Sequence, residues 1–291
     1  MRQMQARAVE RQQAGMLAFV RACAAAAWLE YRTLRYYPSN LLLASVQELT
    51  SVGVWYFVAR FLDAGASASV RQYGGNYLAY VVVGVLLNQV CLAALNGPFT
   101  TISDAFWDKR LETYRLSIHG IWANVVGRLW WQVGFSLALQ GVALLFLLRF
   151  GGLSLHADIN LPLVLLAFAL LLGANAGLGI AGASLFFLLE VKSGQDPITW
   201  AYRYLVMLFS GLYVPLSILP GWLRALGAVL PQTYGLAAVR SLVLTGASLP
   251  AVGGNLAGLA ITSLVALAAG YLLLSYALRR SERHGGIGVV V

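Results

Sequence analysis

The sequence has 291 residues, of which 59% are hydrophobic and only 11% are charged, whereas soluble domains average about 25% charged residues. This composition excludes an ordinary soluble domain and indicates an integral membrane protein made of apolar helices. The formal net charge of +9 is concentrated at the ends of apolar segments, so we attribute it to the charge asymmetry of membrane proteins rather than to nucleic-acid binding.

The N-terminal region is predicted to be a basic helix lying in the membrane interface. Residues 1–13 are polar, and residues 14–37 have an amphipathic pattern. At about 100° per residue, Met16, Val20 and Tyr31 fall on one face, and Arg21 and Arg32 fall on the neighbouring face. A basic helix with an apolar face is typical of the interface; a soluble helix packed on a partner is the alternative. The long basic region argues against a signal peptide.

Six apolar stretches are each predicted to cross the bilayer, so the predicted fold class is an all-α membrane protein. A hydrocarbon core of about 30 Å needs about 20 helical residues. The second span is predicted to end at Asn96-Gly97-Pro98. The fourth carries Gly173, Gly177 and Ala181 at four-residue spacing, which favours close packing of helices. The predicted spans cover residues 41–62, 76–95, 121–148, 161–189, 200–219 and 254–278.

The segment after the start of the fifth span is too apolar to be an ordinary loop. Gly211 and Pro215 are predicted to bend the fifth span near its far end, and Pro220-Gly221 to stop it. Residues 222–230 and 233–244 then look helical, but at about 14 and 18 Å they are too short to cross the membrane. We predict two re-entrant half-helices in one leaflet, with Arg224 and Arg240 reaching the lipid headgroups.

The distribution of basic residues predicts the orientation. Six spans place both ends of the chain on one side, and that side then holds 15 of the 20 lysine and arginine residues. Basic residues accumulate on the cytoplasmic side, so both termini are predicted to be cytoplasmic. Residues 1–40 form the N-terminus and interface helix, residues 41–280 form the transmembrane domain, and residues 281–291 form a short tail.

The loop FTTISDAFWDKRLETYRLSIHG, residues 99–120, is the most charged internal segment. Thr101 or Ser103 is predicted to cap a helix that runs through Arg115, with three carboxylates on one face. We predict that this loop docks on a partner; a solvated amphipathic helix is the alternative. A second inner loop, residues 190–199, is expected to add contacts. The candidate coupling residues are Asp104, Phe106, Trp107, Asp108, Arg110, Leu111, Glu112 and Thr113.

A second set of candidate residues lies within or near the spans. Glu48 is costly in lipid and should face protein or water, where a carboxylate could relay protons. The aromatic residues near the span boundaries are typical of an interface belt, with a stacking track for a planar solute or sugar as the alternative. The candidate residues for a substrate path or gate are Glu48, Trp55, Tyr56, Gly211, Tyr213 and Pro215.

The sequence contains no GxxxxGK[ST] motif, so this chain is not expected to bind ATP in a P-loop. Cys23 and Cys91 are far apart and indicate neither a disulfide framework nor a thiolate metal site. The carboxylates of the 99–120 loop lack a DxxDG-type pattern, and His119 is isolated, so no metal site and no catalytic residue are predicted. A membrane enzyme remains a minor alternative.

The run FSGLYVPLSILPGWLRALGAVLPQTYGLAAVR, residues 209–240, follows KSGQDPITW. This order of broken span, PGWL and two half-helices resembles the permease subunits of ABC exporters of the ABC-2 class, especially drug-type and nodulation-factor-type permeases. Weaker resemblance extends from about Ala18 to Arg280. Where the family often has a Gly-Thr-Leu-Glu-like tetrad in its coupling helix, this sequence has Arg110-Leu111-Glu112-Thr113.

The resemblance implies a plasma-membrane subunit that exports a hydrophobic small molecule, a lipid or a glycan. It implies a separate ATPase subunit that carries ATP and Mg²⁺, a homodimer or heterodimer of permeases, and no cofactor in this chain. It also places the coupling helix between spans two and three. A proton- or ion-coupled carrier or channel that uses Glu48 is the main alternative.

Overall fold

The computed structural model of the protein describes residues 2–66, 70, 73–74, 76–116, 120–153, 155–188 and 197–283. All regular elements within these ranges are helices. Five helices of these described ranges are long and apolar enough to cross a membrane, so the chain is a helical, multi-pass membrane protein. They are α2 (Pro38–Ala66), α3 (Tyr77–Trp107), α5 (Gly120–Phe150), α6 (Leu161–Leu188) and α10 (Leu249–Arg283).

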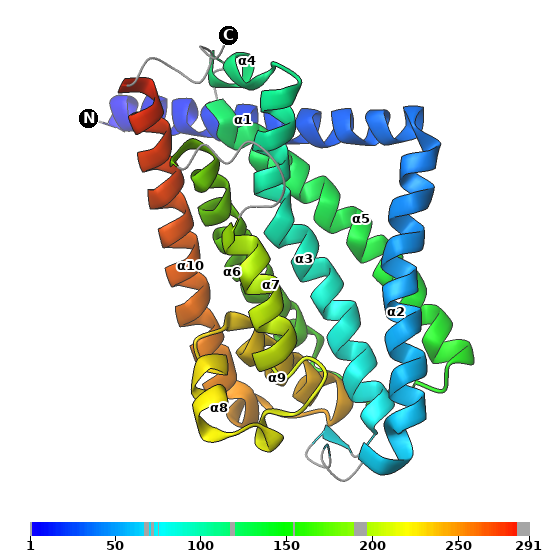
Figure 1. The fold of residues 1–291 in the computed structure, drawn as a ribbon. Helices are drawn as coiled ribbons and strands as arrows, with labels where there is room; N and C mark the ends of the chain where they lie inside the picture. Colours follow the sequence, from blue (N-terminus) through cyan, green and yellow to red (C-terminus); the bar gives the residue numbers. More distant parts are fainter. Residues whose placement is uncertain are drawn as a thin grey trace.

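Helix α1 (Arg2–Tyr36) lies across one end of the helix bundle, nearly perpendicular to the long helices (Figure 1). It ends at Tyr36, close to the predicted end at residue 37, and α2 begins at Pro38, three residues before the predicted first span. Gly127 of α5 allows the crossing, because a Cβ at this position would overlap the Cys23 carbonyl and lie 2.7 Å from Ala26 Cβ. Cys23 is fully buried there, whereas Met16 of the predicted apolar face is 68% exposed. Of that face, Tyr31 packs edge-on against Trp131 of α5, with ring centroids 5.5 Å apart, so only part of it packs on the bundle.

Helix α3 is the central helix, and it corrects the prediction that the second span ends at Asn96-Gly97-Pro98. The helix continues through Pro98 to Trp107, about two and a half further turns. A proline inside a helix removes the hydrogen bond to the carbonyl four residues earlier, here that of Ala94. Thr101 Oγ1 donates to the Gly97 carbonyl at 2.7 Å, and Gly179 brings the α6 backbone against the carbonyls of Ala94 and Leu95. Neighbouring groups thus support the helix past its proline.

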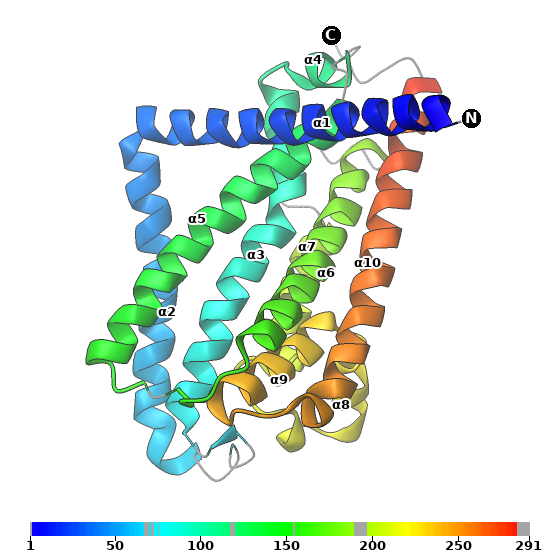
Figure 2. The same cartoon turned by 180° about the vertical axis from the view of Figure 1, so that it is seen from behind.

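The predicted small-residue ridge on α6 packs directly against α10. A Cβ at Gly177 would lie 2.5 Å from the backbone of Ala266 and Leu267 of α10. Gly270 of α10 meets the Gly177 carbonyl in the same contact. In Figure 2, α6 and α10 run side by side, whereas α5 and α6 diverge away from α1.

The fifth predicted span is shorter than expected. Helix α7 (Pro197–Phe209) has 13 residues and ends before Gly211, so the prediction of a helix that reaches residue 219 and bends at Pro215 is wrong. Gly211 has a φ of +79°, a conformation that favours glycine and turns the chain out of the helix. Pro215 instead precedes a 3-10 helix at Leu216–Ile218.

Two short helices follow, at the end of the molecule opposite α1 (Figure 1). They are α8 (Gly221–Gly227) and α9 (Pro231–Leu244), close to the predicted ranges, and Pro231 occupies the first turn of α9. The predicted second inner loop falls mainly on residues 189–196, and most of the predicted tail falls on residues 284–291. Both lie outside the described residues.

Candidate functional site

Arg240 of α9 is the centre of the most elaborate polar contact in the described structure. The side chain is 1% exposed. Its Nε donates to the Tyr80 carbonyl at 3.0 Å, and its two terminal nitrogens donate to the carbonyls of Gly211 and Leu212, both at 2.7 Å. The guanidinium carbon lies 3.6 Å from the centre of the Tyr80 ring. Arginine suits this role because its planar group presents several donors at fixed angles.

This geometry overturns the prediction that Arg240 reaches the lipid headgroups. The chain leaves α7 at Phe209, and the carbonyls of Gly211 and Leu212 lose the partners that a continuing helix would supply. Arg240 supplies the missing donors. The sequence held a signal, because Gln232, Leu236 and Arg240 are spaced by four and share the buried face of α9. Arg224, in contrast, is exposed and donates to the Ser217 and Leu219 carbonyls.

Three of the predicted gate residues, Trp55, Gly211 and Tyr213, belong to this contact. Trp55 of α2 stacks on Tyr213, with ring centroids 3.6 Å apart. The hydroxyl of Tyr77 donates to the Tyr213 carbonyl at 3.1 Å, and that of Tyr80 donates to the Gly211 carbonyl at 2.5 Å. The segment after α7 is thus held by α2, α3 and α9. We call this group of residues the Arg240 cluster: Trp55, Tyr77, Tyr80, Gly211, Leu212, Tyr213 and Arg240.

The other predicted gate residues lie elsewhere. Tyr56 donates to the Gly151 carbonyl at 3.1 Å and accepts from Arg60 at 2.8 Å. Pro215 precedes the 3-10 helix and contributes no side-chain hydrogen bond to it. The sequence therefore grouped residues that the structure divides between the Arg240 cluster and the α2–α5 contact.

Glu48 of α2 faces α5. Its Oε2 accepts from Ser136 Oγ at 3.0 Å and from Gln140 Nε2 at 2.9 Å. Ser136 and Gln140 are 0% and 5% exposed, so both donors are shielded from solvent. The carboxylate is thus partnered by protein, as the cost of a charge in lipid requires. These two donors were not among the residues predicted from the sequence.

A chain of amide side chains links α3, α6 and α9. Asn175 Nδ2 donates to Gln232 Oε1 at 3.1 Å, and Gln232 Nε2 donates to Asn88 Oδ1 at 3.2 Å. Gln232 is 0% exposed and Asn175 is 2% exposed. Polar side chains that bond across helices hold them together in an apolar environment. Together with Arg240, this chain ties α9 to the long helices.

At the α1 end, Arg128 of α5 links three helices. Its Nε lies 2.9 Å from Glu30 Oε1 of α1, and a terminal nitrogen donates to Asp104 Oδ2 of α3 at 2.8 Å. The Arg128 side chain is 14% exposed, whereas that of Asp104 is 51% exposed. Glu30 was not recognised from the sequence, because its partner lies almost 100 residues away along the chain.

The predicted docking loop is not one helix. Helix α3 runs to Trp107, a turn follows in which Lys109 has a φ of 57°, and α4 (Leu111–Leu116) begins a new helix. The predictions that Thr101 or Ser103 caps a helix through Arg115, and that three carboxylates share one face, are therefore wrong. Both residues lie inside α3, and the turn separates Asp104 from α4.

The turn divides the predicted coupling residues into anchors and an exposed group. Phe106 packs edge-on against Phe186 with ring centroids 5.2 Å apart, and Leu111 is 6% exposed. Trp107 is 61% exposed, and Arg110 forms an ion pair with Asp108. Thr113 is also exposed, and the side chain of Glu112 lies outside the described residues. The anchors hold the turn in place and present Trp107, Asp108, Arg110 and Thr113 on the surface.

In the part of the chain that the structure describes, no group of three or more histidine, cysteine, aspartate or glutamate side chains could hold a metal ion. The polar contacts above join helices to one another. They define a multi-pass helical membrane protein with a braced, non-helical break after α7.

Comparison with known proteins adds no family to this description. No family model matches the sequence, and no curated protein matches it.

Proposed function

We propose that this chain is the transmembrane subunit of an ATP-driven exporter of the ABC-2 class. It would move a hydrophobic small molecule, a lipid or a glycan across the plasma membrane, with ATP and Mg²⁺ bound by a separate ATPase subunit. Two permease chains, identical or paralogous, would form the pathway. The observation that carries the proposal is the α3–α4 turn, where anchored neighbours hold an exposed tryptophan at the α1 end.

The exposed turn suits a protein partner. Trp107 is 61% exposed beside the Asp108–Arg110 ion pair. Tryptophan and arginine are the residues most enriched at the centres of protein interfaces. The Arg128 contacts with Glu30 and Asp104 connect α1, α3 and α5 directly behind the turn. A force applied at the turn would therefore reach the interface helix and two long helices together.

The path of the chain supports six crossings. Helix α6 ends near α1, where Phe186 packs on Phe99, and α10 begins near α9, where Val252 packs in the same cluster as Leu242. The chain between them must pass once from one end to the other, and α7 lies on that path (Figure 1). We infer that α7 and the segment after it form the fifth span, with α8 and α9 as re-entrant helices on the outer side.

The orientation follows from the same assignment. The α1 end would be cytoplasmic, because α1, the α3–α4 turn and the end of α10 carry most of the basic residues. The ATPase would then bind at the α3–α4 turn. The Arg240 cluster would brace the outer half of the pathway.

Replacing Trp107 by alanine is expected to weaken binding of the ATPase subunit by roughly thirty-fold, because buried tryptophans dominate the binding energy of interfaces. The full-length chain would be reconstituted with the proposed ABC ATPase subunit, and the affinity between the two would be measured by microscale thermophoresis. Trp222→Ala is the matched control, because Trp222 is 69% exposed at the opposite end of the molecule. Equal affinity for Trp107→Ala and wild type would contradict the docking assignment.

Replacing Glu48 by glutamine is expected to leave the ATPase rate of the reconstituted complex within about twofold of wild type, because an amide oxygen still accepts from Ser136. A proton- or ion-coupled carrier predicts the opposite. Its wild-type chain, alone in liposomes, would dissipate a pH gradient reported by an internal dye, and Glu48→Gln would abolish that flux. Detection of this flux would favour the carrier and refute the exporter proposal.

A further inference from the structure

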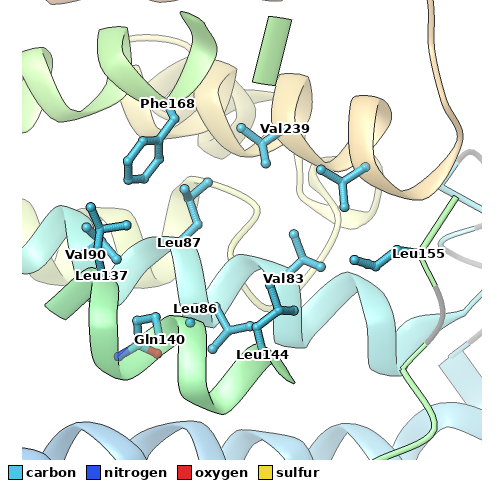
Figure 3. A pocket seen from close by; sticks show the side chains of 12 residues that line it. Val83, Leu86, Leu87, Val90, Leu137, Gln140, Leu144, Leu155, Phe168 and Val239 are labelled. Atoms are coloured by element: carbon cyan, nitrogen blue, oxygen red, sulfur yellow. The ribbon is translucent and has the colours of Figure 1, made fainter. Parts of the chain in front are cut away.

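Two apolar cavities lie end to end along α3 and α5; the first is closed by α9 and by Phe168 of α6, and the second is closed by α6. The first has a volume of about 240 Å³ and the second of about 350 Å³, and Leu137 lines both. Figure 3 shows the first cavity, with side chains of α3 below Phe168 and Val239. We call the pair of cavities the α5–α6 groove. On α3 it extends from Val83 to Ala94, which is about 16 Å of helix.

The groove begins at the level of the interface helix. Trp130, which lines the second cavity, is 49% exposed and lies three residues after Gly127, where α1 crosses α5. Tryptophan is enriched at the depth of lipid headgroups. From that level, a groove of about 16 Å reaches the middle of a hydrocarbon core about 30 Å thick. The groove therefore has the depth of one leaflet.

Two glycines of α5 widen the groove. Gly134 and Gly141 are seven residues apart, so they share one face of α5, and they line the two cavities. A Cβ built at either position meets no atom within 4 Å. Gly127, one further heptad away, differs because a Cβ there would collide with α1. Packing within the chain requires glycine at Gly127 but not at Gly134 or Gly141.

The residues that line the two cavities indicate what kind of ligand the groove can bind. Neither cavity is lined by a charged side chain, and Gln140 is the one polar residue among the lining side chains. Its amide nitrogen is engaged by Glu48 of α2 at 2.9 Å. A helix from another chain, about 10 Å wide, is too thick for cavities of these volumes. A flexible hydrocarbon chain fits, and it would restore the dispersion contacts that an empty groove forfeits.

We propose that the α5–α6 groove is a lipid-binding site that holds one acyl chain of a membrane phospholipid, with the headgroup beside α1 at the level of Trp130. The site does not depend on the transport proposal. An ATPase partner is needed for that proposal, whereas acyl-chain binding is a property of the isolated chain.

The test fills the groove without disturbing the fold. The double variant Gly134→Leu/Gly141→Leu places two side chains in open space, and Gly53→Leu/Gly254→Leu is the matched control, because those glycines also have no atom within 4 Å of a built Cβ but lie on α2 and α10. Each protein would be purified in detergent, incubated with palmitoyl-oleoyl-phosphatidylglycerol, and examined by native mass spectrometry. Melting curves would establish that all three fold.

Wild type and control are expected to retain one phospholipid per chain, and the groove variant to bind it about tenfold more weakly, because each leucine displaces several methylene groups from apolar contact. A second experiment with free oleic acid tests whether the acyl chain comes from a phospholipid or from a free fatty acid. We expect the wild-type protein to retain oleic acid more weakly than the phospholipid. Equal phospholipid retention by the groove variant and the control would overturn the proposal. The proposal would also be overturned if the groove variant lost a dimer of the protein that the wild type forms and kept its lipid, because the groove would then hold a second copy of the protein.

Discussion

Replacing Arg240 by leucine is expected to lower the free energy of unfolding by on the order of 4 kcal/mol, because three buried backbone carbonyls lose a charged donor, although the Gly211 carbonyl keeps the Tyr80 hydroxyl as a donor. For a chain of this size, such a loss corresponds to a fall in melting temperature of about 10 °C. Differential scanning fluorimetry of the protein in detergent would measure it. The effect should be large because the side chain is fully buried and bonds the carbonyls of Tyr80, Gly211 and Leu212.

A matched control lies 16 residues earlier in the same region. Arg224 also donates to two backbone carbonyls, but it is exposed, and its hydrogen bonds are longer, at 3.2 and 3.4 Å. Arg224→Leu should therefore change the melting temperature by about 1 °C or less, since water can replace the arginine. If both variants melted alike, the buried contact of Arg240 would not be the brace that its geometry indicates.

A second variant perturbs the same contact without removing the arginine. A Cβ at Gly84 of α3 would overlap a terminal nitrogen of Arg240 and lie 3.0 Å from its central carbon. Gly84→Val should therefore displace the guanidinium from the Gly211 and Leu212 carbonyls. Combined with Arg240→Leu, its cost should be smaller than the sum of the two single costs, because both act on one contact.

The sequence predicted the parts of the fold that depend on hydropathy. Long apolar stretches identified α2, α5, α6 and α10, and the amphipathic pattern that ends at residue 37 separated α1 from α2. These features are local, since about 20 apolar residues between polar ends suffice to define a membrane-spanning helix. The short helices α8 and α9 were also located, because proline punctuates them.

The predictions of helix ends were wrong where contacts with other helices determine where a helix ends. Pro98 looks like a helix end, but α3 continues beyond it, packed against the backbone of α6 at Gly179. Pro215 looks like a bend, but α7 ends earlier, at Phe209, and the buried Arg240 donates to the carbonyls of Gly211 and Leu212 that follow. In each case the deciding group is on another helix, so its effect cannot be read from the local pattern.

The candidate site was predicted in part. Trp55, Gly211 and Tyr213 do come together, but the residue that organises them, Arg240, was assigned to the headgroups. An arginine in an apolar half-helix can take two positions: its side chain can extend to the membrane interface, or it can bond to carbonyls inside the protein. The four-residue spacing from Gln232 favours the second position.

Replacing Gly177 by alanine is expected to cost about 3 kcal/mol, the upper end of the range for overpacked cores. The added Cβ would lie 2.5 Å from the backbone of Ala266 and Leu267, and backbone atoms cannot move aside as a flexible side chain can. Helices α6 and α10 would have to separate along their shared contact. The measurement is the melting temperature in detergent, supported by the urea midpoint of unfolding where the transition is reversible.

A glycine-to-alanine substitution at an open position should raise the stability of the protein instead of lowering it. Gly254, also in α10, has no atom within 4 Å of a built Cβ. Gly254→Ala should therefore stabilise the protein by about 0.5–1 kcal/mol through helix propensity alone. Gly270→Ala should behave like Gly177→Ala, because its Cβ would collide with the Gly177 carbonyl. Since both act on one contact, the double variant should cost less than the sum; full additivity would show that α6 and α10 do not meet at these two glycines.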